Sequence, residues 1–108
     1  KNTSYMAIKK ITIFWRDIPS QILIQRGRKR KKKMLEHRFQ EAIDRAAMRA
    51  GKGGSGAYIE EWRRVSEIIE SDINDDAYLE EEIKNTQSSY TDDDLKDLIR
   101  NHGENRSH

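Results

Sequence analysis

The stretch KKITIFWRDIPSQILIQR, residues 9–26, constrains the fold most, because it predicts a β-hairpin that cannot be stable by itself. In its first half, apolar side chains recur at every second position, at Ile11, Ile13 and Trp15. In its second half, Ile22 and Ile24 share one face. A period of two with β-branched and aromatic residues indicates strands. A lone hairpin is only marginally stable in water, so we expect it to pack on helices or to pair with another strand.

A long amphipathic helix is predicted after the hairpin. Apolar side chains recur at helical spacing from Leu35 to Ala50, and Gly51 occupies the position that often ends a helix. Because Lys, Arg and Met also favour helix, we expect the helix to begin near residue 29, with a run of cations in its first turns. The following GKGGSG, residues 51–56, predicts a flexible connector, and its lysine is misplaced for a phosphate-binding loop.

Shorter helices are predicted in the acidic second half of the chain. Residues 57–72 carry an apolar stripe at helical spacing, and residues 75–85 form a second amphipathic stretch. Residues 91–103 begin at Thr91, a favourable N-cap. The predicted fold class is therefore α+β: an N-terminal β-hairpin packed on one long helix, followed by two or three shorter helices.

One domain accounts for most of the predicted structure. A chain of 108 residues is expected to hold a single α+β domain, here over residues 7–101. Residues 1–6 are expected to form a flexible N-terminal extension, and residues 102–108 are expected to form a flexible tail.

The composition predicts a thin hydrophobic core. Apolar residues make up 34% and charged residues 37% of the chain, against about 45–50% and about 25% in typical globular domains. We therefore expect a partner protein to stabilise the chain. The absence of cysteine excludes disulfides and cysteine-based zinc sites, and it fits a cytoplasmic location. No apolar run approaches the roughly 20 residues of a membrane-spanning helix, so no membrane partner is expected.

The charges are divided unevenly between the two halves of the chain. Residues 1–50 contain 14 basic and 4 acidic residues, and residues 51–108 contain 7 and 15, so the halves carry net charges of +10 and −8. Such asymmetry is typical of a basic half that binds an anionic partner. It is also compatible with an acidic half that folds back and neutralises the basic half.

The stretch RGRKRKKK is the strongest candidate binding site. In the first turns of the predicted helix it would oppose the helix dipole and bring like charges together, so a functional role is expected. A nucleic acid, an anionic ligand and an acidic protein are the competing partners. The candidate residues for anion or partner binding are Arg26, Arg28, Lys29, Arg30, Lys31, Lys32 and Lys33.

A second candidate is a partner-binding anchor around Trp62. Trp and Arg are the commonest hot-spot residues of protein interfaces. Trp62 is followed directly by Arg63 and Arg64 and lies one helical turn after Tyr58. The alternative is an ordinary core tryptophan on the predicted second helix.

No arrangement of residues predicts catalysis. The histidines His37, His102 and His108 lack the spacing of metal ligands, and no serine lies on a nucleophile elbow. Paired acids such as Glu60 and Glu61 fit solvated helix faces. The chain is therefore predicted not to be an enzyme, and no cofactor or metal is expected.

Four motifs together resemble the small bacterial "virulence factor" domain family. They are W-R-D-I-P from Trp15, the basic run from Gly27, F-x-x-A-I-D-R-A-A-M from Phe39 and A-Y-x-x-E-W-R-R from Ala57. The resemblance places a family-like core at residues 7–64 and leaves an acidic helical part at residues 65–101.

The family name records a phenotype rather than a reaction. Short members are encoded beside folate and cobalamin one-carbon genes, so the resemblance implies a larger partner such as a methylenetetrahydrofolate reductase-like enzyme or a methyltransferase. It also implies a polyglutamyl folate tail as a ligand complementary to the basic run. The predicted function is a non-catalytic accessory or adaptor subunit that binds an anionic partner, in folate-dependent one-carbon metabolism. The alternative is a nucleic-acid-binding module, associated with RNA or the ribosome, that uses residues 26–33.

Overall fold

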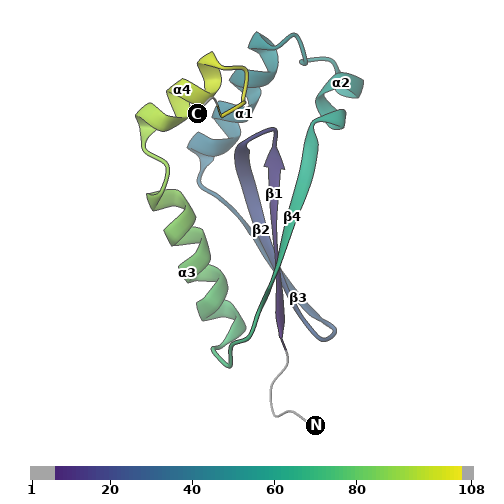
Figure 1. The fold of residues 1–108 in the computed structure, drawn as a ribbon, viewed down its shortest axis with the longest axis vertical. Helices are drawn as coiled ribbons and strands as arrows, with labels where there is room; N and C mark the ends of the chain where they lie inside the picture. Colours follow the sequence, from purple (N-terminus) through teal and green to yellow (C-terminus); the bar gives the residue numbers. More distant parts are fainter. Residues whose placement is uncertain (1–6, 106–108) are drawn as a thin grey trace.

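The computed structural model of the protein describes residues 7–105, which form one four-stranded antiparallel sheet and four helices (Figure 1). The predicted α+β class is confirmed. Residues 1–6 of the predicted extension and residues 106–108 of the predicted tail lie outside the described residues. The strands are β1 (Ile8–Trp15), β2 (Ile18–Arg26), β3 (Lys29–Met34) and β4 (Trp62–Ile69). The helices are α1 (His37–Arg49), α2 (Ser55–Glu60), α3 (Asp75–Ser88) and α4 (Asp92–Arg100).

The predicted hairpin of β1 and β2 forms the centre of the sheet, whose strand order is β3-β2-β1-β4. Ile11 of β1 lies opposite Leu23 of β2. Arg16, with a φ of 54°, lies in the turn that joins the two strands. The two outer strands supply the further pairing that a marginal hairpin requires.

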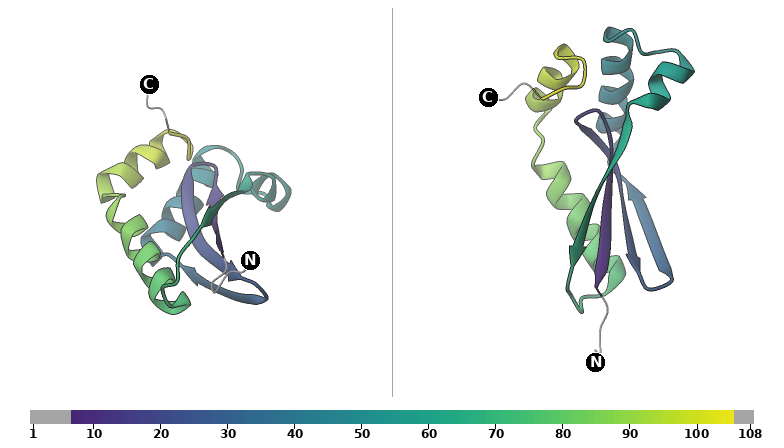
Figure 2. Two further views of the ribbon diagram at one scale, coloured as in Figure 1. Left: turned by 60° about the horizontal axis from the view of Figure 1, so that its bottom comes forward. Right: turned by 45° about the vertical axis from the view of Figure 1, so that its right-hand side comes forward.

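The hydrophobic core lies between one face of the sheet and the helices. Ile22 and Ile24 of β2 are buried in one cluster with Phe39 and Ile43 of α1 and with Ile83 of α3. The left view of Figure 2 shows α3 and α4 on the same side of the strands. Full burial of an Ile or Phe side chain contributes roughly 1.5–3 kcal/mol. This single layer of apolar contacts is therefore the main source of stability in a chain with few apolar residues.

Local sequence signals define both the start and the end of helix α4. The predicted N-cap Thr91 forms a capping box with Asp94. Beyond the other end, Gly103 has a φ of 88°, and a Cβ at this position would lie 2.9 Å from the Trp15 ring, so only glycine fits. The Gly103 carbonyl accepts a hydrogen bond of 2.8 Å from the backbone N–H of Asp17. The start of the predicted tail is therefore held against the turn between β1 and β2.

The prediction that the basic run begins a helix is wrong. Lys29–Met34 forms β3, and α1 starts only at His37. The turn between β2 and β3 consists of Gly27 and Arg28, and Gly27 has a φ of 61°, as the first residue of a tight hairpin turn often does. Backbone hydrogen bonds to β2 override the helical preference of Lys and Arg. The strand also places neighbouring cations on opposite faces, which relieves their repulsion.

The predicted helix over residues 57–72 is wrong in its second part. Helix α2 ends at Glu60, and Trp62–Ile69 forms β4, with Val65 opposite Thr12 of β1. The outer edge of β1 offers a row of backbone donors and acceptors, and an antiparallel strand satisfies them. The β-branched residues of this segment also suit a strand.

The predicted order of one hairpin followed by helices holds only roughly. Strand β3 precedes α1, and β4 separates α2 from α3. Helix α1 has 13 residues and α3 has 14, so the described chain has two helices of similar length rather than one long helix. Helix α1 ends as predicted, with Gly51 at a φ of 72° directly after the C-cap Ala50.

Candidate partner-binding face

The strand register sorts the side chains of the sheet into a covered face and an open face. Residues directly opposite each other in an antiparallel pair point to the same face. Ile22 and Ile24 lie in the core and therefore define the covered face. The opposite face carries twelve strand residues, and Ile11, at 7% exposure, is the buried one among them. We call this set the open face: Lys9, Ile11, Ile13, Gln21, Leu23, Gln25, Arg30, Lys32, Met34, Arg64, Ser66 and Ile68.

The open face combines apolar and cationic side chains, and none of its twelve residues is acidic. Ile68 is 67% exposed and Met34 is 54% exposed. The face looks away from α3 and α4, which lie on the other side of the sheet (Figure 2). Its cations come from all of the strands except β2: Lys9, Arg30, Lys32 and Arg64. Such a face attracts a surface that carries carboxylates and apolar groups.

Helix α3 neutralises two of the three β3 cations that point to the covered face. Lys31 pairs with Asp76 at 2.8 Å, and Lys33 pairs with Glu80. The hydrogen bond from Lys31 to the Asp76 carboxylate raises the pKa of Lys31. The acidic half of the chain does fold back on the basic half, and where it meets the basic run it covers a strand rather than the predicted helix.

Arg26 joins β2 to the chain segment that leads into α3. Its guanidinium binds the Asp75 carboxylate at 2.8 Å and donates to the carbonyls of Ser71 at 2.8 Å and Ile73 at 3.0 Å. The Arg26 and Asp75 side chains are only 16% and 14% exposed. Arg26 therefore holds the fold together and contributes no charge to the open face.

The remaining cations of the basic run make no ion pair within residues 7–105. Arg30 and Lys32 belong to the open face, Arg28 lies in the hairpin turn, and Lys29 lies opposite Arg26. The structure therefore divides the predicted anion-binding set in two. One part is neutralised by α3, and the other part is available to a partner.

The predicted anchor around Trp62 is divided in the same way. Trp62 is half-buried and meets Tyr58 edge-on, with ring centroids 5.6 Å apart, and Tyr58 in turn stacks on Trp15. Arg63 donates to the Arg16 carbonyl at 2.7 Å and lies over the Phe14 ring. Of the predicted anchor, Tyr58, Trp62 and Arg63 therefore stabilise the end of the sheet through contacts within the chain.

Arg64 is the anchor residue that lies on the open face, beside Ile13 of β1. Lys9, Met34 and Ile68 also lie on this face and are not among the predicted site residues. The alternation of β1 and the glycine turn at Gly27 are the signals that would have revealed this face, because together they predict a third strand.

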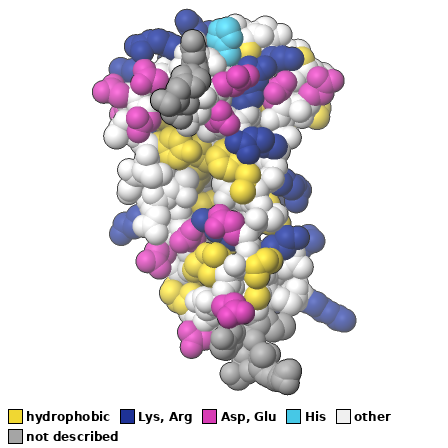
Figure 3. All heavy atoms as spheres, viewed as in Figure 1, with side chains coloured by type: hydrophobic (Ala, Val, Ile, Leu, Met, Phe, Trp, Pro, Cys, Tyr) yellow, Lys and Arg dark blue, Asp and Glu magenta, His cyan; other side chains and the backbone are white. Residues whose placement is uncertain are grey.

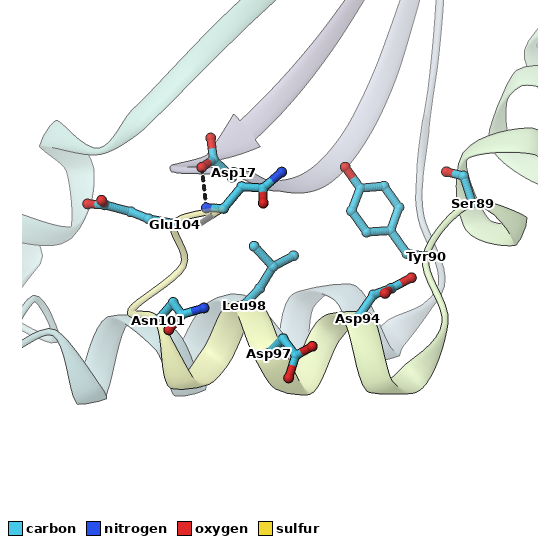
Figure 4. Close-up of a pocket in the computed structure, with 9 residues that line it drawn as sticks. Asp17, Ser89, Tyr90, Asp94, Asp97, Leu98, Asn101 and Glu104 are labelled. Atoms are coloured by element: carbon cyan, nitrogen blue, oxygen red, sulfur yellow. Dashed lines mark hydrogen bonds between the residues drawn. The ribbon is translucent and has the colours of Figure 1, made fainter. Parts of the chain in front are cut away.

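A hollow of about 240 Å³ alongside α4 is acidic and does not match an anionic ligand (Figure 4). Asp17 accepts a hydrogen bond from the backbone N–H of Asn105 and pairs with Arg63. Asp97 pairs with Arg100. Burial raises the pKa of Tyr90 in its wall, and the Asp17 charge adds to the increase. The acids of this hollow therefore have structural partners.

No cluster of three or more potential metal ligands exists among residues 7–105. In the same part of the chain, none of the helices combines the length and the apolar content that crossing a membrane requires.

Comparison with known proteins places the chain in a family. Neither a curated protein nor a solved structure matches it. The model of the family described as "Virulence factor" matches residues 13–99. The match extends from β1 through the acidic helices to α4, beyond the predicted family-like core of residues 7–64. The chain belongs to the Virulence factor family.

Proposed function

We propose that this protein is a non-catalytic accessory domain that binds an acidic protein surface through its open face. The observation that carries the proposal is the distribution of charge. The twelve residues of the open face include four cations and no acid, while α3 pairs with Lys31 and Lys33, which point the other way. A solvated surface of mixed charge would not require this separation.

Electrostatic complementarity favours encounter with an acidic surface, and apolar contacts then add affinity. The exposed apolar residues of the open face give such a partner somewhere to bury its own apolar side chains. Met34 lies on the same strand as Arg30 and Lys32, and Ile68 lies on the same strand as Arg64. Each outer strand therefore presents both a cationic and an apolar group on the open face.

The composition of the open face favours a protein over a nucleic acid. Sheets that bind single-stranded RNA stack bases on exposed aromatic rings. The five apolar residues of the open face are all aliphatic, and the nearby Trp62 packs against Tyr58. A partner enzyme of one-carbon metabolism and a polyglutamyl ligand stay predictions of the family resemblance.

The test compares two sets of substitutions that remove the same charge. The first set is Arg30→Gln, Lys32→Gln and Arg64→Gln on the open face. The matched control is Arg49→Gln, Lys84→Gln and Lys96→Gln, which removes three helix-borne cations that form no ion pair within the described residues. Partners recovered with the tagged full chain are purified, and their Kd is measured for both variants at about 0.15 M salt.

We expect the open-face variant to raise the Kd at least about tenfold, while the control stays within about twofold. Equal effects of the two variants would overturn the proposal, because net charge alone would then explain binding. Binding of mixed short RNAs that only the open-face variant abolishes would replace it with the nucleic-acid-binding function.

A further inference from the structure

The two edges of the sheet differ in whether they can pair with another strand. β3 carries cations at five consecutive positions, from Lys29 to Lys33, so a second copy of β3 would place like charges opposite each other. β4 has eight residues of mixed character, from Trp62 to Ile69, and pairs with β1 along one side. Within residues 7–105, no backbone hydrogen bond is made along the other side of β4. β4 is therefore the edge open to strand addition.

The side chains at this edge are accessible. Val65 is 37% exposed, and the Glu67 side chain is 52% exposed, with only a distant ion pair of 4.0 Å to Lys10. In the view of Figure 3, hydrophobic side chains reach the surface between the segments that Figure 1 labels α3 and β4. An exposed edge with apolar residues and no proline is the kind that pairs with another chain.

The sequence of β4, WRRVSEII, is complementary to itself in one antiparallel register. A twofold axis perpendicular to the sheet keeps the same face of both copies on one side. With Val65 opposite Val65 of the second copy, each Arg63 lies opposite a Glu67. On the other face, each Trp62 lies opposite an Ile68. Oppositely charged and apolar pairs of this kind stabilise an antiparallel strand pair.

Neighbouring registers lack this match. A twofold axis at Ser66 places Val65 opposite Glu67 and Arg64 opposite Ile68. A twofold axis at Arg64 brings two guanidinium groups together. Only the register centred on Val65 combines two opposite-charge pairs with matched apolar pairs.

We propose that two copies of this protein associate through β4 in the register centred on Val65, which joins their sheets into one antiparallel sheet. The shared twofold axis places both open faces on the same side. The dimer therefore presents one continuous cationic face of twice the area, although the partner-binding role of that face is not needed for the association.

Cysteine cross-linking tests the register directly, because the chain has no cysteine of its own. Val65→Cys places two thiols opposite each other in the dimer, whereas Ile68→Cys separates them by six residues along the strands. Ile68 is 67% exposed and Val65 is 37% exposed, so random collision would favour the control. In a glutathione redox buffer, we expect Val65→Cys to form disulfide-linked dimers at least about tenfold faster than Ile68→Cys. Equal rates, or a faster Ile68→Cys, would overturn the register.

A charge exchange between two variants tests the pairing by an independent route. Arg63→Glu alone and Glu67→Arg alone each place like charges opposite each other, so each is expected to weaken self-association about tenfold in sedimentation equilibrium. An equimolar mixture restores both opposite-charge pairs and is expected to dimerise again. Arg63 also binds Asp17, so circular dichroism first checks that the Arg63→Glu variant is folded. If that variant is unfolded, the self-association of Glu67→Arg alone tests the pairing. A native chain that stays monomeric at its highest soluble concentration would refute the dimer.

Discussion

The buried hydroxyl of Tyr78 on α3 makes the stability of the fold depend on pH. Tyr78 is 8% exposed, and burial raises its pKa from 10 to about 12, with the nearby Glu82 charge adding to the increase. The unfolded chain ionises this tyrosine near pH 10, so its contribution to stability is fully present below pH 10 and is lost as pH rises toward about 12. We expect the free energy of unfolding to fall in this window by on the order of 2 kcal/mol from this group. Tyr78→Phe should remove that part of the fall.

Urea unfolding of both chains at a series of pH values measures the difference. Lysine deprotonation over the same range affects both chains alike, so it cancels in the comparison. If the free energy of unfolding falls equally with pH for the native chain and for Tyr78→Phe, burial does not raise the pKa of the Tyr78 hydroxyl.

Arg26 shows how one side chain fixes the position of a whole element. It holds the segment before α3 by an ion pair with Asp75 and by two backbone carbonyls. Arg26→Gln leaves a poorly exposed carboxylate without its partner, so we expect a loss of about 2 kcal/mol in the free energy of unfolding. Arg28→Gln, two residues along, removes the same charge from a position without an ion pair in the described chain, and should change the stability by less than about 0.5 kcal/mol. Similar urea midpoints for the two variants would contradict this role of Arg26.

The molecule as a whole separates its charges, and α3 pairs with three of the seven cations of the basic run. Asp76→Asn with Glu80→Gln removes the partners of Lys31 and Lys33 without touching the core. We expect this pair to elute from heparin at clearly higher salt than the native chain, because two masked cations become available.

The matched control is Glu60→Gln with Glu70→Gln, which removes two exposed acids without an ion pair in residues 7–105. It changes the net charge by the same amount and should shift the elution much less. Equal shifts for the two pairs would mean that net charge, not masking by α3, controls anion binding.

Local patterns were enough to predict several elements and the family. The alternation around Ile11 and Ile13 predicted the central hairpin, and Thr91 predicted the start of α4. Gly51 predicted the end of α1. These signals act within a few residues, through periodicity, capping and glycine conformation, so they can be read without knowing what packs against them. The motifs that indicated the family are also short stretches of sequence that can be recognised without the tertiary structure.

The outer strands and the candidate face were decided by tertiary structure. Lys29–Met34 has residues that favour helix, and it becomes a strand because β2 offers a free edge after a two-residue turn. Trp62–Ile69 becomes a strand because it meets β1, about fifty residues earlier in the chain. The period of a strand then sends alternate cations to opposite faces, and the placement of α3 decides which of them are neutralised. A run of like charges therefore becomes a one-sided cationic face only after strands and a helix that are distant in sequence have assembled.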